Sequence, residues 1–311
     1  MGPRPLPRAH ADRAATRGRP IGEPSVNPAA NRHFAVDLRV GACHRRAVSL
    51  TRYGVEPHVL AIAHRGGAGL AAENTLAAFE RSYALGLRYL ETDVRITADG
   101  VCLAFHDARL GRVTDGRGPV KRRTWDEIRR LTVLGAEPVA RLDDVLAAFP
   151  DAKFVIDVKD EAALEPLSRV LRATNAVERV CLAGAWDGWL AALRADLGPG
   201  LSCALGWRSL VSWLACSHGR VAPPRRLANG GFVHVPLRWG RLPIFIDRLV
   251  EGAHDLGLRL IVWTVDDLAT MHRLISAGVD GIITDRPDVL REVMIAEGRW
   301  PRTVYAERDD R

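Results

Sequence analysis

The sequence lacks several features that mark secreted or membrane proteins. Its five cysteines are odd in number and form no C-x-x-C pair, which argues against a disulfide framework. No stretch approaches the ~18 consecutive apolar residues of a membrane span. The N-terminus has arginines but no apolar stretch followed by a small-residue cleavage site, so no secretory signal is visible. We therefore expect a cytoplasmic protein without stable membrane insertion.

Lysine is scarce as well, and the excess of positive charge is local. Only three lysines stand beside 41 arginines, a ratio typical of genome-wide codon bias, and we infer no function from it. Residues 1–58 hold ten arginines and four acidic residues, whereas the other 253 residues hold 34 basic and 33 acidic ones. The net charge of +7 therefore belongs to the N-terminal tail. We expect no nucleic-acid partner.

Composition divides the chain into three parts. Residues 1–57 are rich in Pro, Gly, Ala and Arg with little periodic apolar pattern, which predicts a disordered or weakly ordered basic tail. Residues 58–300 alternate short β-runs with amphipathic stretches, the signature of parallel α/β architecture. Residues 301–311 form a polar C-terminal tail.

Eight β/α units are predicted within the central part. Their number and their span of about 240 residues match a (β/α)8 TIM barrel, in which chemistry lies at the carboxyl ends of the strands. The predicted strands are 59–63, 89–94, 153–158, 179–184, 201–205, 231–235, 259–264 and 280–284. The predicted helices are 74–85, 141–149, 161–173, 187–195, 209–216, 244–256, 266–276 and 287–297.

The second strand interrupts this alternation. It runs on to Ala98-Asp99-Gly100 and then to the apolar residues 101–105, which indicates a β-hairpin rather than a strand-to-helix connection. The returning strand would bring His106 back beside Glu91 and Asp93. Residues 107–140 would then form a small insertion with a short helix at 124–131, well placed to shape substrate specificity.

Carboxylates gather at two neighbouring strand ends. Glu91 and Asp93 are two residues apart on one strand, so their side chains share a face. Two inward carboxylates repel each other unless a cation lies between them, and an all-oxygen site suits Mg²⁺, Mn²⁺ or Ca²⁺ better than zinc. Asp157 and Lys159 repeat the spacing on the next barrel strand, where they could complete the metal site and hold a phosphate oxygen. Each pair, taken alone, is also compatible with ion pairs at a barrel rim.

A histidine and a glycine pair follow the first strand. His64 comes directly after the apolar residues 60–63 and precedes Arg65-Gly66-Gly67. Glycines there let backbone N–H groups approach an anion, and the guanidinium adds a bidentate contact to phosphate. A single histidine at a strand end is more often a hydrogen-bonded core residue. Two histidines at one mouth, beside three carboxylates and an arginine, favour phosphodiester chemistry instead.

A competing motif overlaps this segment. Residues 67–72 fit the dinucleotide pattern G-x-G-x-x-A, follow a strand, and have Glu91 at a suitable distance downstream. This motif favours an NAD-dependent oxidoreductase as an alternative. Against it stand the eight predicted strands, the Asp93 hairpin and the absence of a role for His64-Arg65 in the fingerprint.

From residue 64 onward the chain resembles the glycerophosphodiester phosphodiesterase family. The resemblance covers residues 59–297 in family order. The matching stretches are HRGGAGLAAENTLAAFERSYALG at 64–86, ETDVRITADGVCLAFHD at 91–107, LGRVTDGRG at 110–118, FVIDVK at 154–159, VWTVDD at 262–267 and DGIITDRP at 280–287.

The resemblance implies metal-dependent hydrolysis of a glycerophosphodiester to sn-glycerol 3-phosphate and an alcohol. It makes His64 and His106 the general acid–base pair. It makes Glu91, Asp93 and Asp157 the ligands of a divalent cation, Mg²⁺ or Ca²⁺ with Mn²⁺ as a further candidate. Arg65 and Lys159 would bind phosphate oxygens, and Trp263 would wall the alcohol side of the pocket.

Two departures from the family pattern stand out. The family usually has Glu where Asp157 stands, so this metal contact would be made by a shorter side chain. It usually has Pro where Ala72 precedes the Glu-Asn-Thr stretch. Two other functions remain open: a phospholipase D-like or phosphoinositide-cleaving enzyme, with residues 210–215 as its apolar rim or as a helix on the barrel, and a non-catalytic binding protein that uses the basic tail.

Overall fold

A computed structural model describes residues 52–219, 227, 231–239, 242–243 and 246–301 of the chain. Two compact units are distinguished, Met1–Ala47 and Val48–Arg311, and the first lies wholly outside the described residues. The predicted basic tail therefore lies outside them as far as residue 51. The same holds for the predicted C-terminal tail beyond residue 301.

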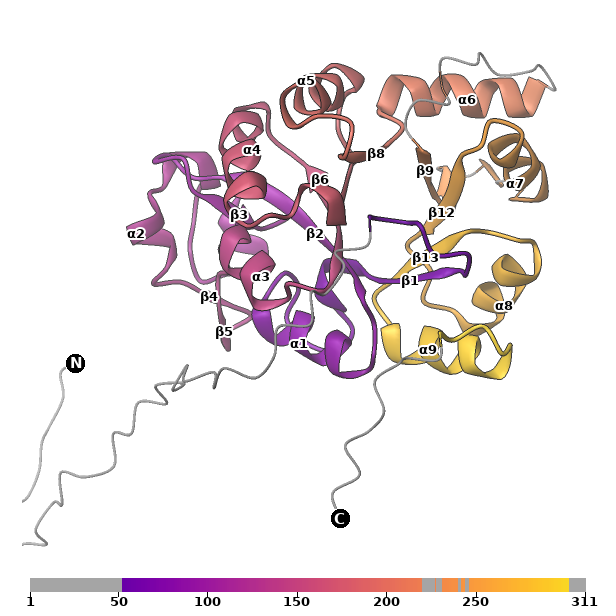
Figure 1. Ribbon diagram of the computed structural model, residues 1–311. Helices are drawn as coiled ribbons and strands as arrows, with labels where there is room; N and C mark the ends of the chain where they lie inside the picture. The colour runs from indigo at the N-terminus through magenta and orange to yellow at the C-terminus, as the bar shows by residue number, and fades with distance from the viewer. Residues whose placement is uncertain (1–51, 220–226, 228–230, 240–241, 244–245, 302–311) are drawn as a thin grey trace, which may run out of the picture. The chain divides into compact units, whose positions relative to one another are not determined.

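Eight parallel strands close into a barrel (Figure 1). The first strand pairs with the second on one side and with the last on the other, which completes the ring. This confirms the predicted TIM barrel, and each strand overlaps a predicted range. The strands are β1 Leu60–Ala63, β2 Tyr89–Ile96, β6 Lys153–Val158, β7 Val180–Ala183, β8 Ser202–Ala204, β9 Gly231–Pro236, β12 Arg259–Trp263 and β13 Gly281–Thr284.

The closed ring argues against the dinucleotide-binding alternative. That fingerprint works at the edge of an open, doubly wound sheet and at the first turn of a helix. Residues 67–72 instead lie in a loop, and the following helix begins only at Leu76. Within this loop the N–H of Gly69 donates to the carbonyl of Asp285, which ties the loop to the end of the last strand.

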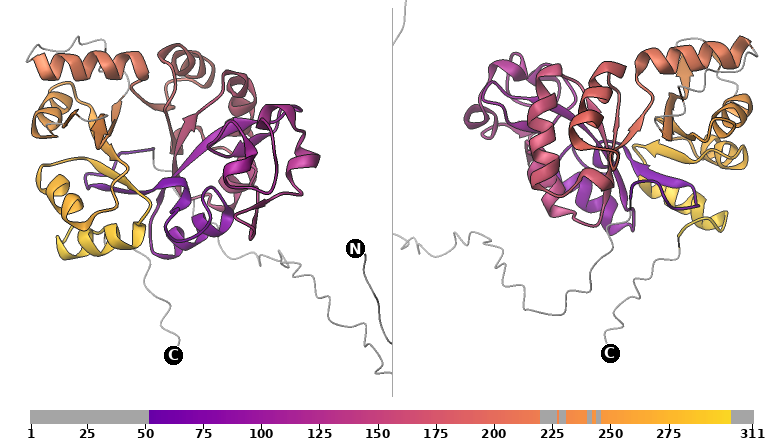
Figure 2. Two further views of the ribbon diagram at one scale, coloured as in Figure 1. Left: turned by 180° about the vertical axis from the view of Figure 1, so that it is seen from behind. Right: turned by 45° about the horizontal axis from the view of Figure 1, so that its top comes forward.

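Helices surround the barrel, as the views from the front and from behind show (Figures 1 and 2). Each of the eight predicted helices is confirmed within one to three residues at either end. They are α1 Leu76–Ala84, α3 Leu142–Ala148, α4 Leu164–Ala173, α5 Asp187–Leu197, α6 Trp207–Gly219, α7 Ile246–His254, α8 Leu268–Ser276 and α9 Pro287–Ala296. Their apolar residues, such as Leu167 and Leu171 of α4, pack on the outward-facing side chains of the strands.

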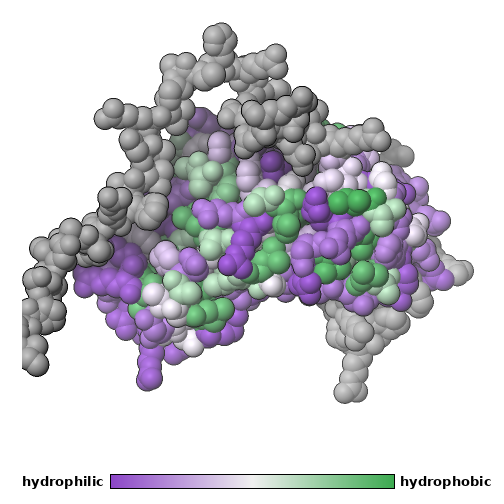
Figure 3. Space-filling model, turned by 90° about the horizontal axis from the view of Figure 1, so that it is seen from below, coloured by the Kyte–Doolittle hydropathy of each residue, from purple (hydrophilic) through white to green (hydrophobic). Residues whose placement is uncertain are grey.

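Helix α6 accounts for the apolar stretch at 210–215. Leu210, Trp213 and Leu214 are buried against the barrel, whereas Val211 is exposed. The interpretation of this stretch as a packing helix is therefore confirmed. The face of the molecule seen from below is mixed, with hydrophilic residues among smaller apolar areas (Figure 3). Among the described helices, none has the length and apolar character that crossing a membrane requires.

The hairpin predicted after the second strand is present. Strand β3, Cys102–Ala104, runs antiparallel to β2, and the N–H of Phe105 donates to the carbonyl of Asp93. The turn residue Asp99 also accepts a hydrogen bond from the N–H of Trp125, which begins the short helix α2, Trp125–Ile128. The N–H of Thr124 donates to the Glu127 carboxylate at 2.9 Å, so the predicted N-cap lies within a capping arrangement.

Residues 107–140 form an insertion with an apolar core of its own. It contains α2 and a two-stranded ribbon of β4, Thr132–Val133, and β5, Glu137–Pro138. A second short ribbon, β10 Arg238–Trp239 with β11 Leu242–Pro243, follows β9. The core of the insertion consists of Leu103, Phe105, Leu110, Val113, Val120, Ile128, Val133 and Val139.

The amino end of the barrel is closed by a residue assigned to the tail. Tyr53 is 2% exposed, and its ring meets those of Tyr89 and Phe232 edge-on at centroid distances of 5.2 and 5.1 Å. The folded part therefore begins several residues before the predicted boundary at 57. Composition did not reveal this because one aromatic residue in a Gly- and Pro-rich stretch gives no periodic signal.

We predict that Tyr53→Ala destabilises the protein by about 3 kcal/mol, the usual cost of removing a large buried ring. Tyr53→Phe is the matched control. The buried hydroxyl of Tyr53 has no hydrogen-bond partner within the part of the chain that the structure describes, so its removal should leave stability unchanged or raise it. Equilibrium unfolding in urea measures both variants. An alanine variant that unfolds at the wild-type midpoint would contradict the packing role.

Candidate active site

Three carboxylates converge at the carboxyl end of the barrel. Glu91 and Asp93 alternate with outward residues of β2, and Asp93 lies directly beside Asp157 in the register of β2 with β6. One oxygen from each of the three lies within 4.8 Å of the others. The sequence prediction that these three residues come together is thereby met. We call them the acidic trio.

Burial makes the acidic trio electrostatically demanding. Glu91 and Asp93 are only 3% and 1% exposed. Burial, followed by the charge of Asp93, raises the pKa of Glu91 well above its ordinary value. Burial opposes ionisation of Asp93 too, but Lys159, His106 and Arg65 outweigh it and lower the pKa of Asp93. Three oxygen donors that repel one another in a buried space match the ligand set of a hard divalent cation.

Lys159 lies between two members of the trio. Its Nζ is 2.7 Å from Oδ2 of Asp157 and 3.1 Å from Oδ1 of Asp93. Burial alone would lower the pKa of Lys159, but the charges of Asp157 and Asp93 outweigh it and raise the pKa, so the ammonium stays charged. Arg95 holds this segment in place, because its guanidinium donates to the carbonyls of Lys159 and His106.

Arg65 contacts the site through both its backbone and its side chain. Its φ of 49° places the residue in the left-handed region, and its N–H donates to Oε2 of Glu91 at 2.7 Å. The guanidinium donates from Nη1 to Glu73 at 2.9 Å, and its buried Nε lies 3.5 Å from Oδ2 of Asp93 without a hydrogen-bond partner. The side chain is therefore positioned beside the trio with donor capacity left for an anion.

His64 is held by a carboxylate that sequence reasoning missed. Its Nδ1 is 2.7 Å from Oδ1 of Asp285, the residue after the last strand, and its Nε2 is 3.9 Å from Oε2 of Glu91. Burial lowers the pKa of His64, but the charges of Glu91 and Asp285 outweigh it and raise the pKa to about 8. The only sequence signal was the pair Thr284-Asp285 at the end of a predicted strand. Its role becomes clear only because β13 pairs with β1.

His106 has a partner of the same kind. Its Nδ1 is 2.7 Å from Oδ1 of the adjacent Asp107, whose other oxygen pairs with Arg112. Arg112 continues to Glu73, which also holds Arg65. In both histidines a carboxylate takes Nδ1, so Nε2 is the nitrogen available for proton transfer. The insertion and the first loop are thereby joined through charged side chains.

Asn74 holds the Asp93 carboxylate of the trio by a hydrogen bond. Its Nδ2 donates to Oδ2 of Asp93 at 3.1 Å, and its Oδ1 accepts from the hydroxyl of Thr92 at 2.7 Å. The sequence analysis marked the Glu-Asn-Thr stretch but assigned no role to Asn74. A buried amide between a carboxylate and a hydroxyl fixes the Asp93 side chain in one orientation.

The remaining predicted residues also lie at this mouth. Trp263 is the last residue of β12 and packs half-buried against the inner barrel cluster. Asp157, the shorter acid, leans toward Gly184 at the end of β7. A Cβ at Gly184 would lie 2.3 Å from Oδ1 of Asp157, and its φ of 63° also favours glycine. Asp157 therefore depends on a glycine at that strand end.

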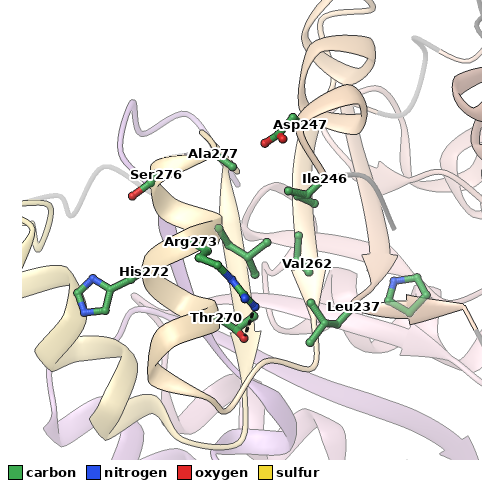
Figure 4. A pocket seen from close by; sticks show the side chains of 11 residues that line it. Leu237, Ile246, Asp247, Val262, Thr270, His272, Arg273, Ser276 and Ala277 are labelled. Atoms are coloured by element: carbon green, nitrogen blue, oxygen red, sulfur yellow. Dashed lines mark hydrogen bonds between the residues drawn. The ribbon is translucent and has the colours of Figure 1, made fainter. Parts of the chain in front are cut away.

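Two hollows of about 660 Å³ lie away from the acidic trio. One of them lies between α7 and α8 on the outer side of the barrel (Figure 4). Val262 points into it because its neighbours Ile261 and Trp263 face the barrel interior. Arg273 crosses this hollow to donate to Thr270 at 2.8 Å. None of its lining residues belongs to the trio or to the histidine pairs, so size alone does not identify the reactive site.

Comparison with known proteins gives a consistent result. The model of the glycerophosphoryl diester phosphodiesterase family matches residues 64–289. The Mycobacterium tuberculosis protein named "Probable glycerophosphodiester phosphodiesterase 2" is 35% identical over 244 residues, which cover 78% of this chain and 92% of that protein. The glycerophosphodiester phosphodiesterase of Caldanaerobacter subterraneus is 32% identical over 246 residues, with coverages of 74% and 96%.

Solved structures share the fold. The glycerophosphodiester phosphodiesterase of Agrobacterium tumefaciens superposes with a TM-score of 0.63 at 25% identity and covers 75% of this chain and 98% of its own. An Oleispira antarctica phosphodiesterase, solved with its product sn-glycerol-3-phosphate, gives a TM-score of 0.61 at 19% identity, with coverages of 76% and 97%. At that identity the likeness concerns the barrel alone.

We predict that His64 of the metal-free protein titrates near pH 8 in an NMR experiment. Because its pKa is raised in the folded state, His64 stabilises the fold fully below about pH 6.5 and loses this contribution as pH rises through about 8. Asp285→Asn should move the pKa toward 6.5. Asp288→Asn is the control, since Asp288 pairs with Arg286 instead. A wild-type value of 6.5 would refute the pairing.

Proposed function

This chain belongs to the glycerophosphoryl diester phosphodiesterase family and is a phosphoric diester hydrolase, and we propose that it cleaves glycerophosphodiesters by general acid–base catalysis at the mouth of the barrel. Hydrolysis yields sn-glycerol 3-phosphate and an alcohol such as choline or ethanolamine. The observation that carries the assignment of residues is the pair of carboxylate-held histidines, His64 with Asp285 and His106 with Asp107, at the barrel mouth that holds the acidic trio.

The acidic trio supports a divalent metal site. Glu91, Asp93 and Asp157 would hold Mg²⁺, Ca²⁺ or Mn²⁺, and such an ion neutralises charge on the phosphoryl oxygens when it is bound. The all-oxygen donor set and the mutual repulsion of the two buried carboxylates and the half-buried Asp157 are consistent with this assignment. The identity of the ion depends on site size and ligand flexibility.

Positive side chains around the trio suit the phosphate. Arg65, whose buried Nε makes no hydrogen bond within the described residues, and Lys159, charged beside Asp157, would each donate to a phosphoryl oxygen. Glu73 keeps the Arg65 guanidinium in place from the opposite side. Negative charge on the phosphoryl oxygens increases in the transition state. Each of these donors therefore stabilises the transition state more than the bound substrate.

The raised pKa of His64 suggests the order of proton transfers. At neutral pH its imidazole is protonated, so His64 would donate a proton from Nε2 to the oxygen of the leaving alcohol. His106 would accept the proton of the attacking hydroxyl, which belongs to water or to the neighbouring glycerol carbon. In the second case a cyclic phosphate forms, and water then opens it with the two histidines in exchanged roles. Trp263 would wall the alcohol side of the pocket.

We predict that His64→Ala and His106→Ala each lower kcat by about 10²- to 10⁴-fold, the usual contribution of a positioned acid or base. Steady-state assays with glycerophosphocholine measure the loss, and circular dichroism checks the fold. His272→Ala is the matched control, because this histidine lies on α8 and pairs with Glu297 outside the site. Near-normal rates in both site variants would reject the acid–base assignment.

A lipid-cleaving activity is the second candidate, since phospholipase D-like or phosphoinositide-cleaving enzymes share this chemistry. It calls for an apolar rim, but the three large apolar residues Leu210, Trp213 and Leu214 of the stretch considered for that role, 210–215, are buried, and Val211 is its one exposed large apolar side chain. The geometry therefore favours small soluble diesters. A cytoplasmic location, expected from the sequence, stays a prediction.

We predict that wild-type protein hydrolyses glycerophosphocholine faster than lysophosphatidylcholine, and that EDTA abolishes the reaction. Adding Mg²⁺, Ca²⁺ or Mn²⁺ back one at a time should restore it and identify the preferred ion. Faster cleavage of the lysolipid would favour the lipid alternative. Full activity in the chelator would remove the metal role while leaving the hydrolase assignment intact.

A further inference from the structure

His234 lies inside the barrel, and neither the sequence motifs nor the mechanism uses it. It stands in the middle of β9, where Val233 and Val235 pack outward against the helices and Phe232 belongs to the inner cluster. Strand alternation therefore turns the His234 side chain toward the barrel interior. It is 8% exposed.

The strand registers place His234 opposite the acidic trio. Around a (β/α)8 barrel, four alternate strands contribute one inward side chain each to a common layer. The strand pairings around the ring define such a layer when the register advances by one residue at each strand. The inward residues of this layer are Glu91 of β2, Ala183 of β7, His234 of β9 and Ile283 of β13. Because β2 and β9 lie four strands apart in this ring of eight, His234 faces Glu91 across the barrel.

This layer forms the floor of the candidate site. One stagger step further toward the mouth, the inward positions are those of His64, Asp157 and Trp263. Ala183 has a small side chain, and Ile283 is apolar. Apart from Glu91, His234 is therefore the polar group that this floor layer offers.

His234 also has an unsatisfied nitrogen. Its Nε2 is fully buried and has no hydrogen-bond partner among the described residues. Leaving a buried polar group unpaired destabilises the fold, a cost that a binding site carries when a ligand supplies the partner. Burial lowers the pKa of His234 to about 4 despite the nearby charge of Asp157, so the ring is neutral and offers one donor and one acceptor.

A neutral group with one donor and one acceptor suits a hydroxyl. A phosphate would be bound better by a cationic side chain. The proposed function supplies such a ligand: every glycerophosphodiester carries a short glycerol arm with free hydroxyls, whereas the alcohol varies in size. A three-carbon arm can reach a closed floor. A bulky alcohol has to extend outward through the mouth.

We propose that Nε2 of His234 hydrogen-bonds a hydroxyl of the glycerol moiety and so makes the site select glycerol-containing phosphodiesters. This role rests on the proposed function. It adds a residue that binds the glycerol moiety, which all glycerophosphodiesters share. The residue acts in recognition, because the proton transfers are already provided by His64 and His106.

Two ligands that differ only in hydroxyls test the role directly. Calorimetric titration, with the activating divalent ion present, would compare sn-glycerol 3-phosphate with n-propyl phosphate. Wild-type protein should bind the glycerol compound about 10-fold more tightly, the value of one hydrogen bond of about 1.4 kcal/mol. In His234→Leu this ratio should fall to near 1. His234→Gln, which keeps a donor and an acceptor, should retain part of it.

Stability separates recognition from a structural role. His234→Leu removes an unpaired buried nitrogen, so it should unfold at the wild-type temperature or above. Ile282→Val, a buried residue on the outward face of β13, should keep the wild-type ratio of affinities. A ratio near 1 in wild-type protein, or an unchanged ratio in His234→Leu, would overturn the proposal. Turnover of glycerophosphocholine by wild-type protein is measured in a separate assay. Failure of the proposed hydrolase function can therefore be told apart from failure of the His234 proposal.

Discussion

Repulsion among three carboxylates in one buried space is the constraint to which the rest of the site responds. Glu91, Asp93 and Asp157 are brought together by the register of two adjacent strands, and burial removes the water that would screen Glu91 and Asp93. Lys159, Arg65 and the two histidines stand around them, each within reach of at least one carboxylate. The ion pairs of Lys159 and Arg65 with Asp93 therefore offset part of this repulsion.

The same charges connect parts of the chain that are distant in sequence. Glu73, in the loop after β1, pairs with Arg65 on one side and with Arg112 of the insertion on the other. Arg112 in turn holds Asp107 and thereby the ring of His106. The first loop and the insertion therefore share one ion-pair network. A change in either segment is transmitted to the orientation of a reactive imidazole.

Much of this organisation was predictable from local patterns. Alternation in β2 put Glu91 and Asp93 on one face, and Asp99-Gly100 announced the hairpin that returns His106 to them. The residues that escaped prediction depend on closure of the ring. Asp285 meets His64 only because the last strand pairs with the first, and His234 faces Glu91 only through the stagger of all eight strands. The burial of Tyr53 was not predicted because a single apolar residue at the barrel end produces no periodic sequence pattern.

The insertion after β3 has its own apolar core, built from residues such as Leu110, Ile128 and Val133 rather than from the barrel. It thus resembles a module whose folding is partly self-sufficient. Substitutions on its surface can accumulate while the ring of strands keeps its stability, provided that the Arg112 link is retained. This arrangement uncouples the sequence of the insertion from the packing of the barrel core.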